Sequence, residues 1–219
     1  YAQNHQESEA ALVFAVIVMC DSGMSQLFAA ARMTSPTGKS HTFDARANGY
    51  ARGEACCCVA LLPESEGLSR VRCEAGSVRQ DGKSASLTAP NGTAQQALIR
   101  AALSSAGRPS RGAFVLEAHG TGTSLGDPIE ARAICAVRDE PDLMSVMGCK
   151  ANVGHTEPTA GVAGAQQLAM VMLERLAGPN AQLRVMNPHV NAALEGSPSL
   201  PVQAQHVEAP HADLVGGVS

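Results

Sequence analysis

Short apolar runs alternate along the chain with longer segments in which apolar residues recur at helical spacing. The runs predict strands and the periodic segments predict helices. The expected strands cover residues 11–19, 55–62, 70–78, 113–118 and 143–149, with a short one at 200–206. The expected helices cover residues 24–33, 93–106, 127–138 and 159–176. Strands that alternate with helices are typical of a layered α/β domain.

Two of the expected helices carry further signals. Thr93 stands where an N-cap is needed for the helix at 93–106, and Gly107 follows its last turn. The helix at 159–176 is apolar nearly all round, from Val162 to Leu176. A helix of this kind is expected to lie at the centre of the molecule, covered on two sides.

Composition excludes several classes of partner. The chain has 219 residues, of which 45% are apolar, enough for the core of one domain or of one and part of another. Its net charge of −4, with 16 Lys and Arg and no basic stripe, argues against a nucleic-acid partner. The apolar run Ala10–Cys20 is too short to span a membrane, and acidic Glu7 and Glu9 precede it in place of the basic residues of a signal peptide. We expect an intracellular protein, in the cytoplasm or a plastid.

Cysteine and glycine spacing also argues against a bound metal or nucleotide. The seven cysteines include three in a row, Cys56–Cys58, and form no Cys-x-x-Cys pair. This usage is typical of buried thiols in a reducing compartment and not of zinc ligands or disulfides. Gly120, Gly122 and Gly126 miss the spacing of a dinucleotide fingerprint by one residue.

Two histidines stand in similar local sequences. His119 lies in EAHGTGTSLGDPIEA (117–131) and His155 in KANVGHTEPTAGVAGA (150–165), each between an expected strand and an expected helix. Such strand ends are where α/β folds build sites. The separation of 36 positions between the histidines spans one helix and one strand, as adjacent parallel β-α units require. We expect the two imidazoles to face one cavity, with ring nitrogens within reach of one small oxygen.

These two segments resemble the two histidine motifs of the β-ketoacyl synthases, the condensing enzymes of fatty-acid and polyketide synthesis. Three further segments match in family order: SPTGKSHTFDARANGYARGEA (35–55), QDGKSASLTAPNGTAQQALIRAAL (80–103) and MNPHV (186–190). Their detail favours the polyketide branch. The resemblance implies a thiolase-like layered α-β-α fold, incomplete and mainly its C-terminal half. Residues 1–62 would belong to the first half, and residues 63–219, with both motifs, to the second.

The resemblance also implies an activity for the complete parent protein. Ketosynthases are acyltransferases that condense acyl and malonyl thioesters with loss of CO₂. The substrates would be carried on the phosphopantetheine of an acyl carrier protein, with no cofactor bound directly, and the parent would be a homodimer within a larger assembly. The family's nucleophilic cysteine stands in a Thr-Ala-Cys-Ser-Ser turn, and none of the seven cysteines here does. We therefore expect an internal fragment that is inactive alone. The alternative is a non-catalytic structural or interaction subunit of ketosynthase ancestry.

The resemblance assigns roles to six residues of the two motifs. His119 and His155 would donate hydrogen bonds to the enolate oxygen that forms on decarboxylation. Lys150 would be the third catalytic residue, and since a lone buried lysine is costly, Glu130 is expected to be its partner. Asp127 and Glu157 are expected to support the site as acceptors that fix the imidazole tautomers.

Small residues beside the histidines are expected to line the substrate. Lack of side-chain bulk lets a pantetheine thioester approach the backbone closely. The residues in question are Gly120, Thr121, Gly122, Thr123, Asn152 and Gly154. One departure from the family stands elsewhere: Phe14 takes the place of a glycine in the first strand, which calls for altered surroundings there.

Overall fold

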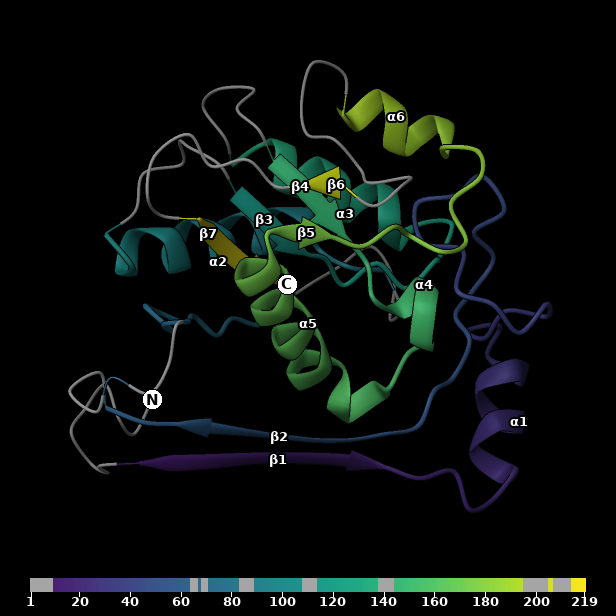
Figure 1. Ribbon diagram of the computed structural model, residues 1–219. Coiled ribbons are helices and arrows are strands. Elements are labelled where there is room, and N and C mark those ends of the chain that lie inside the picture. The colour runs from purple at the N-terminus through teal and green to yellow at the C-terminus, as the bar shows by residue number, and fades with distance from the viewer. Residues whose placement is uncertain are drawn as a thin grey trace.

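Helices lie on both sides of a small parallel sheet in the computed structural model, which describes residues 10–63, 67, 71–82, 89–107, 114–137, 144–194, 205–206 and 214–219 (Figure 1). The strands are β1 (Ala11–Ile17), β2 (Ala55–Leu61), β3 (Phe114–Glu117), β4 (Met144–Met147), β5 (Leu176–Ala177), β6 (Gln205–His206) and β7 (Val215–Val218). The helices are α1 (Gly23–Ala30), α2 (Gly92–Ser105), α3 (Gly126–Cys135), α4 (Lys150–Val153), α5 (Ala160–Glu174) and α6 (Pro188–Leu194), with the 3₁₀ turn η2 (Glu157–Thr159).

The central sheet has the strand order β4-β3-β7, and both pairings are parallel. Leu116 lies opposite Val146 on one side and Gly217 on the other. Parallel neighbours need a crossover, and α3 provides the one between β3 and β4. Strands β1 and β2 form a separate antiparallel ribbon, and β5 pairs with β6. This arrangement confirms the α/β layering predicted from the alternating pattern.

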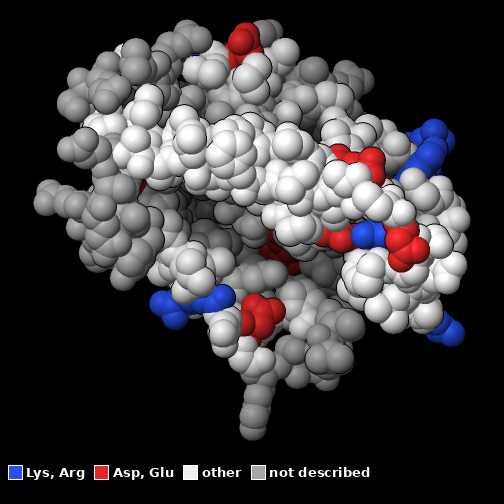
Figure 2. All heavy atoms as spheres, turned by 90° about the horizontal axis from the view of Figure 1, so that it is seen from below, with Lys and Arg blue, Asp and Glu red and all other residues white. Residues whose placement is uncertain are grey.

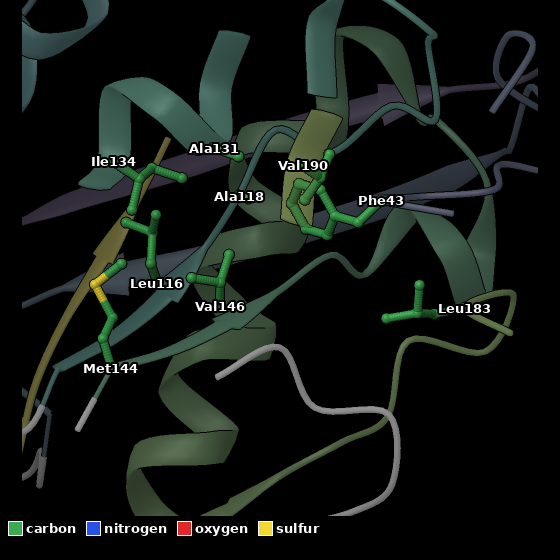
Figure 3. Packing of buried hydrophobic residues seen from close by; sticks show 9 residues of the cluster. All are labelled: Phe43, Leu116, Ala118, Ala131, Ile134, Met144, Val146, Leu183 and Val190. Atoms are coloured by element: carbon green, nitrogen blue, oxygen red, sulfur yellow. The ribbon is translucent and has the colours of Figure 1, made fainter. Parts of the chain in front are cut away.

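Helix α5 lies between the ribbon and the central sheet, and it contacts β2 as well as β3 and β7 (Figure 1). Side chains alternate across β3, so Val115 points to α5 and Leu116 to the opposite side. Helix α3 covers that opposite side and packs against α2 and α6. Figure 3 shows the core formed there, which consists of Phe43, Leu116, Ala118, Ala131, Ile134, Met144, Val146, Leu183 and Val190.

Two details of the predicted elements were wrong, and a third was right only in part. Helix α2 begins one residue early, and its N-cap is Asn91, whose side chain accepts from the N–H groups of Thr93 and Ala94. One expected strand, at 70–78, is absent from its described part, residues 71–78. Val78 there is 96% exposed, so this segment gains little stability from burying apolar side chains. Helix α5 is covered by two sheets as expected, but one flank stays open, with Met170 54% exposed.

The outer face of β1 is apolar and exposed. Leu12, Phe14 and Val16 of β1, and Val18 directly after it, are each at least 60% exposed. Figure 2 views the molecule from this side and shows a broad band without charged side chains. Phe14, which replaces a family glycine, therefore occupies no space in the described core. Of the described helices, none has both the length and the apolar content needed to cross a membrane.

The segment 31–54, between α1 and β2, contains almost no regular structure but connects distant parts of the chain. Isolated bridges join Asp44 to Met186 and Arg52 to His155. The Thr42 hydroxyl donates to the Gly120 carbonyl oxygen at 2.6 Å. This segment therefore lies against both histidine motifs and determines how their loops are held.

Candidate active site

The two motif histidines lie side by side beyond the carboxyl ends of β3 and β4. The ring centroids of His119 and His155 are 5.4 Å apart, with an angle of 88° between the ring planes. His119 is exposed and His155 is half-buried. The structure thus brings together two imidazoles that are 36 positions apart in the sequence.

Glu130 holds the loop that carries His119. This buried carboxylate on α3 accepts from the backbone N–H of His119 at 2.7 Å and from that of Gly120 at 2.8 Å. The predicted Glu130–Lys150 ion pair was wrong: within the described part of the chain Lys150 has no salt bridge. Two backbone donors already take up the carboxylate oxygens of Glu130, so this acid orients the His119 loop instead of the lysine.

Asp127 anchors the same loop to the segment 31–54. Its carboxylate accepts from the backbone N–H groups of Phe43, Gly122 and Thr123 at 2.8, 3.1 and 3.3 Å. Burial raises the pKa of Asp127 to about 7, while these N–H donors favour its charged form. The prediction that Asp127 fixes an imidazole tautomer was wrong, because its acceptor oxygens bind backbone amides.

His155 is held through both its backbone and its ring. Its N–H donates to the Ala51 carbonyl at 2.7 Å, and its carbonyl accepts from the Gly53 N–H at 2.9 Å. Its ring Nδ1 accepts from the Glu157 backbone N–H at 3.1 Å. A ring nitrogen that accepts carries no proton, so His155 is the neutral Nε2–H tautomer. Glu157 thus supports His155 through its amide, and not through its carboxylate as predicted.

Burial, reinforced by the nearby charges of Lys150 and His119, lowers the pKa of His155 to about 4. The ring therefore remains neutral at physiological pH. The Nε2–H group of His155 can therefore donate a hydrogen bond throughout the physiological pH range.

The depressed pKa makes stability depend on pH in a defined direction. An unfolded histidine titrates near 6.5 and the folded one near 4, so acid favours the unfolded chain. The contribution is complete above the unfolded pKa and is lost as pH falls toward the folded one. We expect the difference in unfolding free energy between wild type and His155→Gln to fall by about 1–3 kcal/mol between about pH 7 and about pH 4.5, measured by urea denaturation. An unchanged difference would contradict the burial of a neutral ring.

Residues that received no predicted role also surround His155. The Tyr50 ring lies edge-on to the His155 ring, with centroids 4.9 Å apart. Arg52 pairs with Glu157 at 2.6 Å. Tyr50 and Arg52 stand in the segment 35–55, which resembles the family. The resemblance of this segment could have drawn attention to them, but a loop has no periodic pattern to show which of its side chains point to the site.

Three glycines of the motifs allow the segment 31–54 to approach their backbone closely. Gly120 and Gly122 have φ angles of 45° and 79°, which favour glycine. A Cβ on Gly120 would lie 2.7 Å from the Thr42 methyl carbon, and one on Gly122 would lie 2.7 Å from the His41 nitrogen. Gly154, with φ of 80°, approaches the backbone of Arg52 in the same way. These glycines were expected to admit a thioester, but the space at their Cβ positions is filled by the segment 31–54.

The other three expected substrate-lining residues make hydrogen bonds or close polar contacts within the protein. The Thr123 hydroxyl accepts from the Gly126 N–H at 3.2 Å, where α3 begins. Thr121 is buried, and its hydroxyl lies 3.4 Å from that of Thr123. Asn152 is exposed and accepts from the Ala181 N–H at 3.2 Å.

Cys149 directly precedes Lys150 in the sequence, and its surroundings disfavour the thiolate. Burial and the adjacent Glu117 raise the pKa of its thiol to about 12, so almost no thiolate forms at neutral pH. Glu117 is itself buried, and one of its oxygens accepts from the Cys149 N–H at 2.7 Å. Among the described residues, no three His, Cys, Asp or Glu side chains are grouped as a metal site would require.

Comparisons with known proteins identify the family of the chain. Residues 72–184 match the family model "Beta-ketoacyl synthase, C-terminal domain", and residues 4–67 match "Beta-ketoacyl synthase, N-terminal domain". A highly reducing polyketide synthase of Aspergillus terreus is 35% identical over 189 residues, 83% of this chain and 7% of that protein. A phenolphthiocerol/phthiocerol polyketide synthase of Mycobacterium tuberculosis is 40% identical over 166 residues, 71% of this chain and 9% of that protein.

The solved structures show the same relationship. The ketosynthase from module 6 of the bacillaene synthase of Bacillus subtilis 168 superposes with a TM-score of 0.86 and 28% identity. The match covers 97% of this chain and 39% of that one, so the chain spans well under half of a solved ketosynthase. This likeness confirms the predicted thiolase-like fold. The chain belongs to the β-ketoacyl synthase family, and it is similar to a short part of polyketide synthases.

Proposed function

We propose that this chain supplies the enolate-stabilising half of the active site in a ketosynthase domain of a polyketide synthase. The observation that carries the proposal is the pair of adjacent rings, His119 and His155, with centroids 5.4 Å apart. At this separation one nitrogen of each ring can donate to a single oxygen placed between them. Preorganised donors aimed at a developing oxyanion are usually the largest contribution to catalysis of this kind.

The proposed reaction assigns each residue a step. A malonyl thioester loses CO₂ by cleavage of the bond between its carboxylate carbon and its α-carbon. The bonding electrons move to the thioester oxygen, which becomes an enolate oxygen, and N–H groups of His119 and His155 donate to it. The enolate carbon then attacks the carbonyl of an acyl thioester, whose thiolate leaves. The buried side chain of Lys150 lies close enough to both rings to interact with them electrostatically.

The proposal includes the carrier of the substrates. Both acyl groups would arrive as thioesters on the phosphopantetheine of an acyl carrier protein, within a dimeric synthase. The relatives support this assignment because they are polyketide synthases of which the chain matches only 7–9%. The acyl thioester would be held on a cysteine outside this chain, since none of the seven cysteines stands in a Thr-Ala-Cys-Ser-Ser turn. Cys149 beside the site also has a raised thiol pKa.

Decarboxylation by a ketosynthase domain that contains this chain tests the proposal. We expect the domain to release CO₂ from a malonyl thioester borne on an acyl carrier protein, at a rate well above that of the carrier alone. The assay follows the CO₂ and the acetyl thioester that remains. Absence of CO₂ release from a folded domain would contradict the proposed function.

One observation favours the alternative, a non-catalytic subunit held in an assembly. The exposed apolar face formed by Leu12, Phe14 and Val16 of β1, with Val18 after it, is the kind of surface that another polypeptide covers. A folded domain that binds its partners stably but releases no CO₂ would support this reading. The facing histidines have no explanation in it, and we therefore prefer the catalytic proposal.

A further inference from the structure

Arg52 connects helix α1 with the loop that follows His155. Its Nε and Nη2 donate to the two carboxylate oxygens of Glu157 at 2.6 and 3.1 Å, and its Nη1 donates to the Ser25 hydroxyl at 2.7 Å. Its Cζ atom lies 5.2 Å from the centroid of the Phe28 ring. The Arg52 side chain is only 10% exposed, so this two-pronged pair is largely screened from water. A planar guanidinium fork fits a carboxylate in this way and a lysine does not.

The carboxylate that Arg52 holds belongs to a residue in an unfavourable backbone conformation. Glu157 has a φ of 46°, in the left-handed region that residues with a Cβ avoid. Such a conformation persists only when its surroundings hold it. The same residue presents its N–H to Nδ1 of His155 at 3.1 Å. The side chain of Glu157 is therefore anchored by Arg52, while its amide orients the histidine ring.

The backbone of His155 has a separate support. Its N–H and carbonyl are bound by Ala51 and Gly53 at 2.7 and 2.9 Å, and these bonds need no side chain of Arg52. Loss of the guanidinium would leave His155 in place along the chain. What it would release is Glu157, and with it the hydrogen bond to Nδ1.

We propose that Arg52 is a positioning residue that acts through Glu157 to keep the His155 ring in its Nε2–H tautomer, with Nδ1 as the acceptor. The ring is then oriented before any substrate arrives. The consequence for decarboxylation rests on the proposed function, in which Nε2–H of His155 donates to the enolate oxygen. The tautomer itself is a property of the chain and can be measured without any activity.

The test uses the full chain, labelled with ¹⁵N, and compares wild type with Arg52→Gln, Arg52→Lys and Glu157→Gln. Imidazole ¹⁵N chemical shifts report the tautomer, and hydrogen exchange reports protection of the Glu157 amide. The control is Arg132→Gln, an identical change at an exposed arginine on α3. Backbone spectra of the core strands β3 and β4 show which variants are folded.

We expect one Nε2–H tautomer in wild type and in Arg132→Gln. In Arg52→Gln and Glu157→Gln, the Nδ1–H tautomer should appear, and the Glu157 amide should exchange faster by on the order of tenfold. Arg52→Lys keeps the charge but not the fork, so its spectrum should lie between those of wild type and Arg52→Gln. If Arg52→Gln fails to fold, Glu157→Gln alone tests whether the Arg52–Glu157 pair keeps His155 in its Nε2–H tautomer.

Wild-type tautomer and wild-type exchange in folded Glu157→Gln would overturn the proposal. A different outcome would concern the proposed function instead. If the tautomer changes as expected while decarboxylation by the ketosynthase domain stays normal, Arg52 remains a positioning residue, and the catalytic role of His155 is wrong.

Discussion

Replacing either His119 or His155 by alanine in a ketosynthase domain that contains this chain should slow malonyl decarboxylation by about 10²–10³-fold, the loss seen when one oxyanion donor is removed elsewhere. Each ring is placed by backbone contacts that an alanine would keep: Glu130 with the amide of His119, and Ala51 with the amide of His155. The fold should therefore survive both changes, because neither ring fills the described core.

Two comparisons make this expectation specific. His189→Ala is the matched control, since that histidine is exposed on α6 and should leave the rate unchanged. Transfer of an acyl group onto the domain's nucleophile is measured separately, and decarboxylation should suffer more than transfer in both variants. Normal decarboxylation together with impaired transfer would show that the histidines act on the acyl group and not on the enolate.

Elements could be predicted from the sequence where burial imposes a pattern on the chain. Strands β3 and β4 are buried on both faces, so they appear as short apolar runs, and their ends locate His119 and His155. The segment 31–54 has no such pattern, because its contacts are made residue by residue. This segment contains Asp44, Tyr50 and Arg52. No periodic pattern in it predicts where these side chains point.

The site was predictable in its members and less so in its connections. The sequence spacing correctly predicted that the two histidines lie at neighbouring strand ends. It does not predict which hydrogen-bond donor lies next to a given carboxylate. Glu130 was assigned to Lys150, whereas the backbone amides of His119 and Gly120 lie closer in the folded chain. Backbone N–H groups are present at nearly every residue, so sequence patterns that consider only side chains miss these partners.

The second large effect concerns Asp44, which ties the segment 31–54 to the segment before α6. Its carboxylate has no exposed surface and accepts from Arg46 side-chain atoms at 2.7 and 3.0 Å. It also accepts from the backbone N–H groups of Arg46, Arg184 and Val185 at 2.9, 2.6 and 3.0 Å. Burial alone would raise the pKa of Asp44, but Arg46 and these three amides hold it well below its usual value. The charged form is thus strongly favoured in the folded chain.

Asp44→Ala should therefore lower the free energy of unfolding by about 3–5 kcal/mol, because it leaves buried donors without an acceptor. That is a large share of the roughly 5–15 kcal/mol that stabilises a typical domain. Asp44→Asn should cost less, since the amide oxygen still accepts. Urea denaturation measures both, with Glu174→Ala, an exposed acid on α5, as the control that should change little.

The depressed pKa of Asp44 also predicts a pH dependence. The difference in unfolding free energy between wild type and Asp44→Asn should be largest near neutral pH and should shrink as pH falls below about 4. If Asp44→Ala unfolds like the control, the carboxylate does not hold this segment. The placement of Tyr50 and Arg52 beside His155 must then depend on the segment's other contacts, such as the backbone bridge at Arg52 and the bond from Phe43 to Asp127.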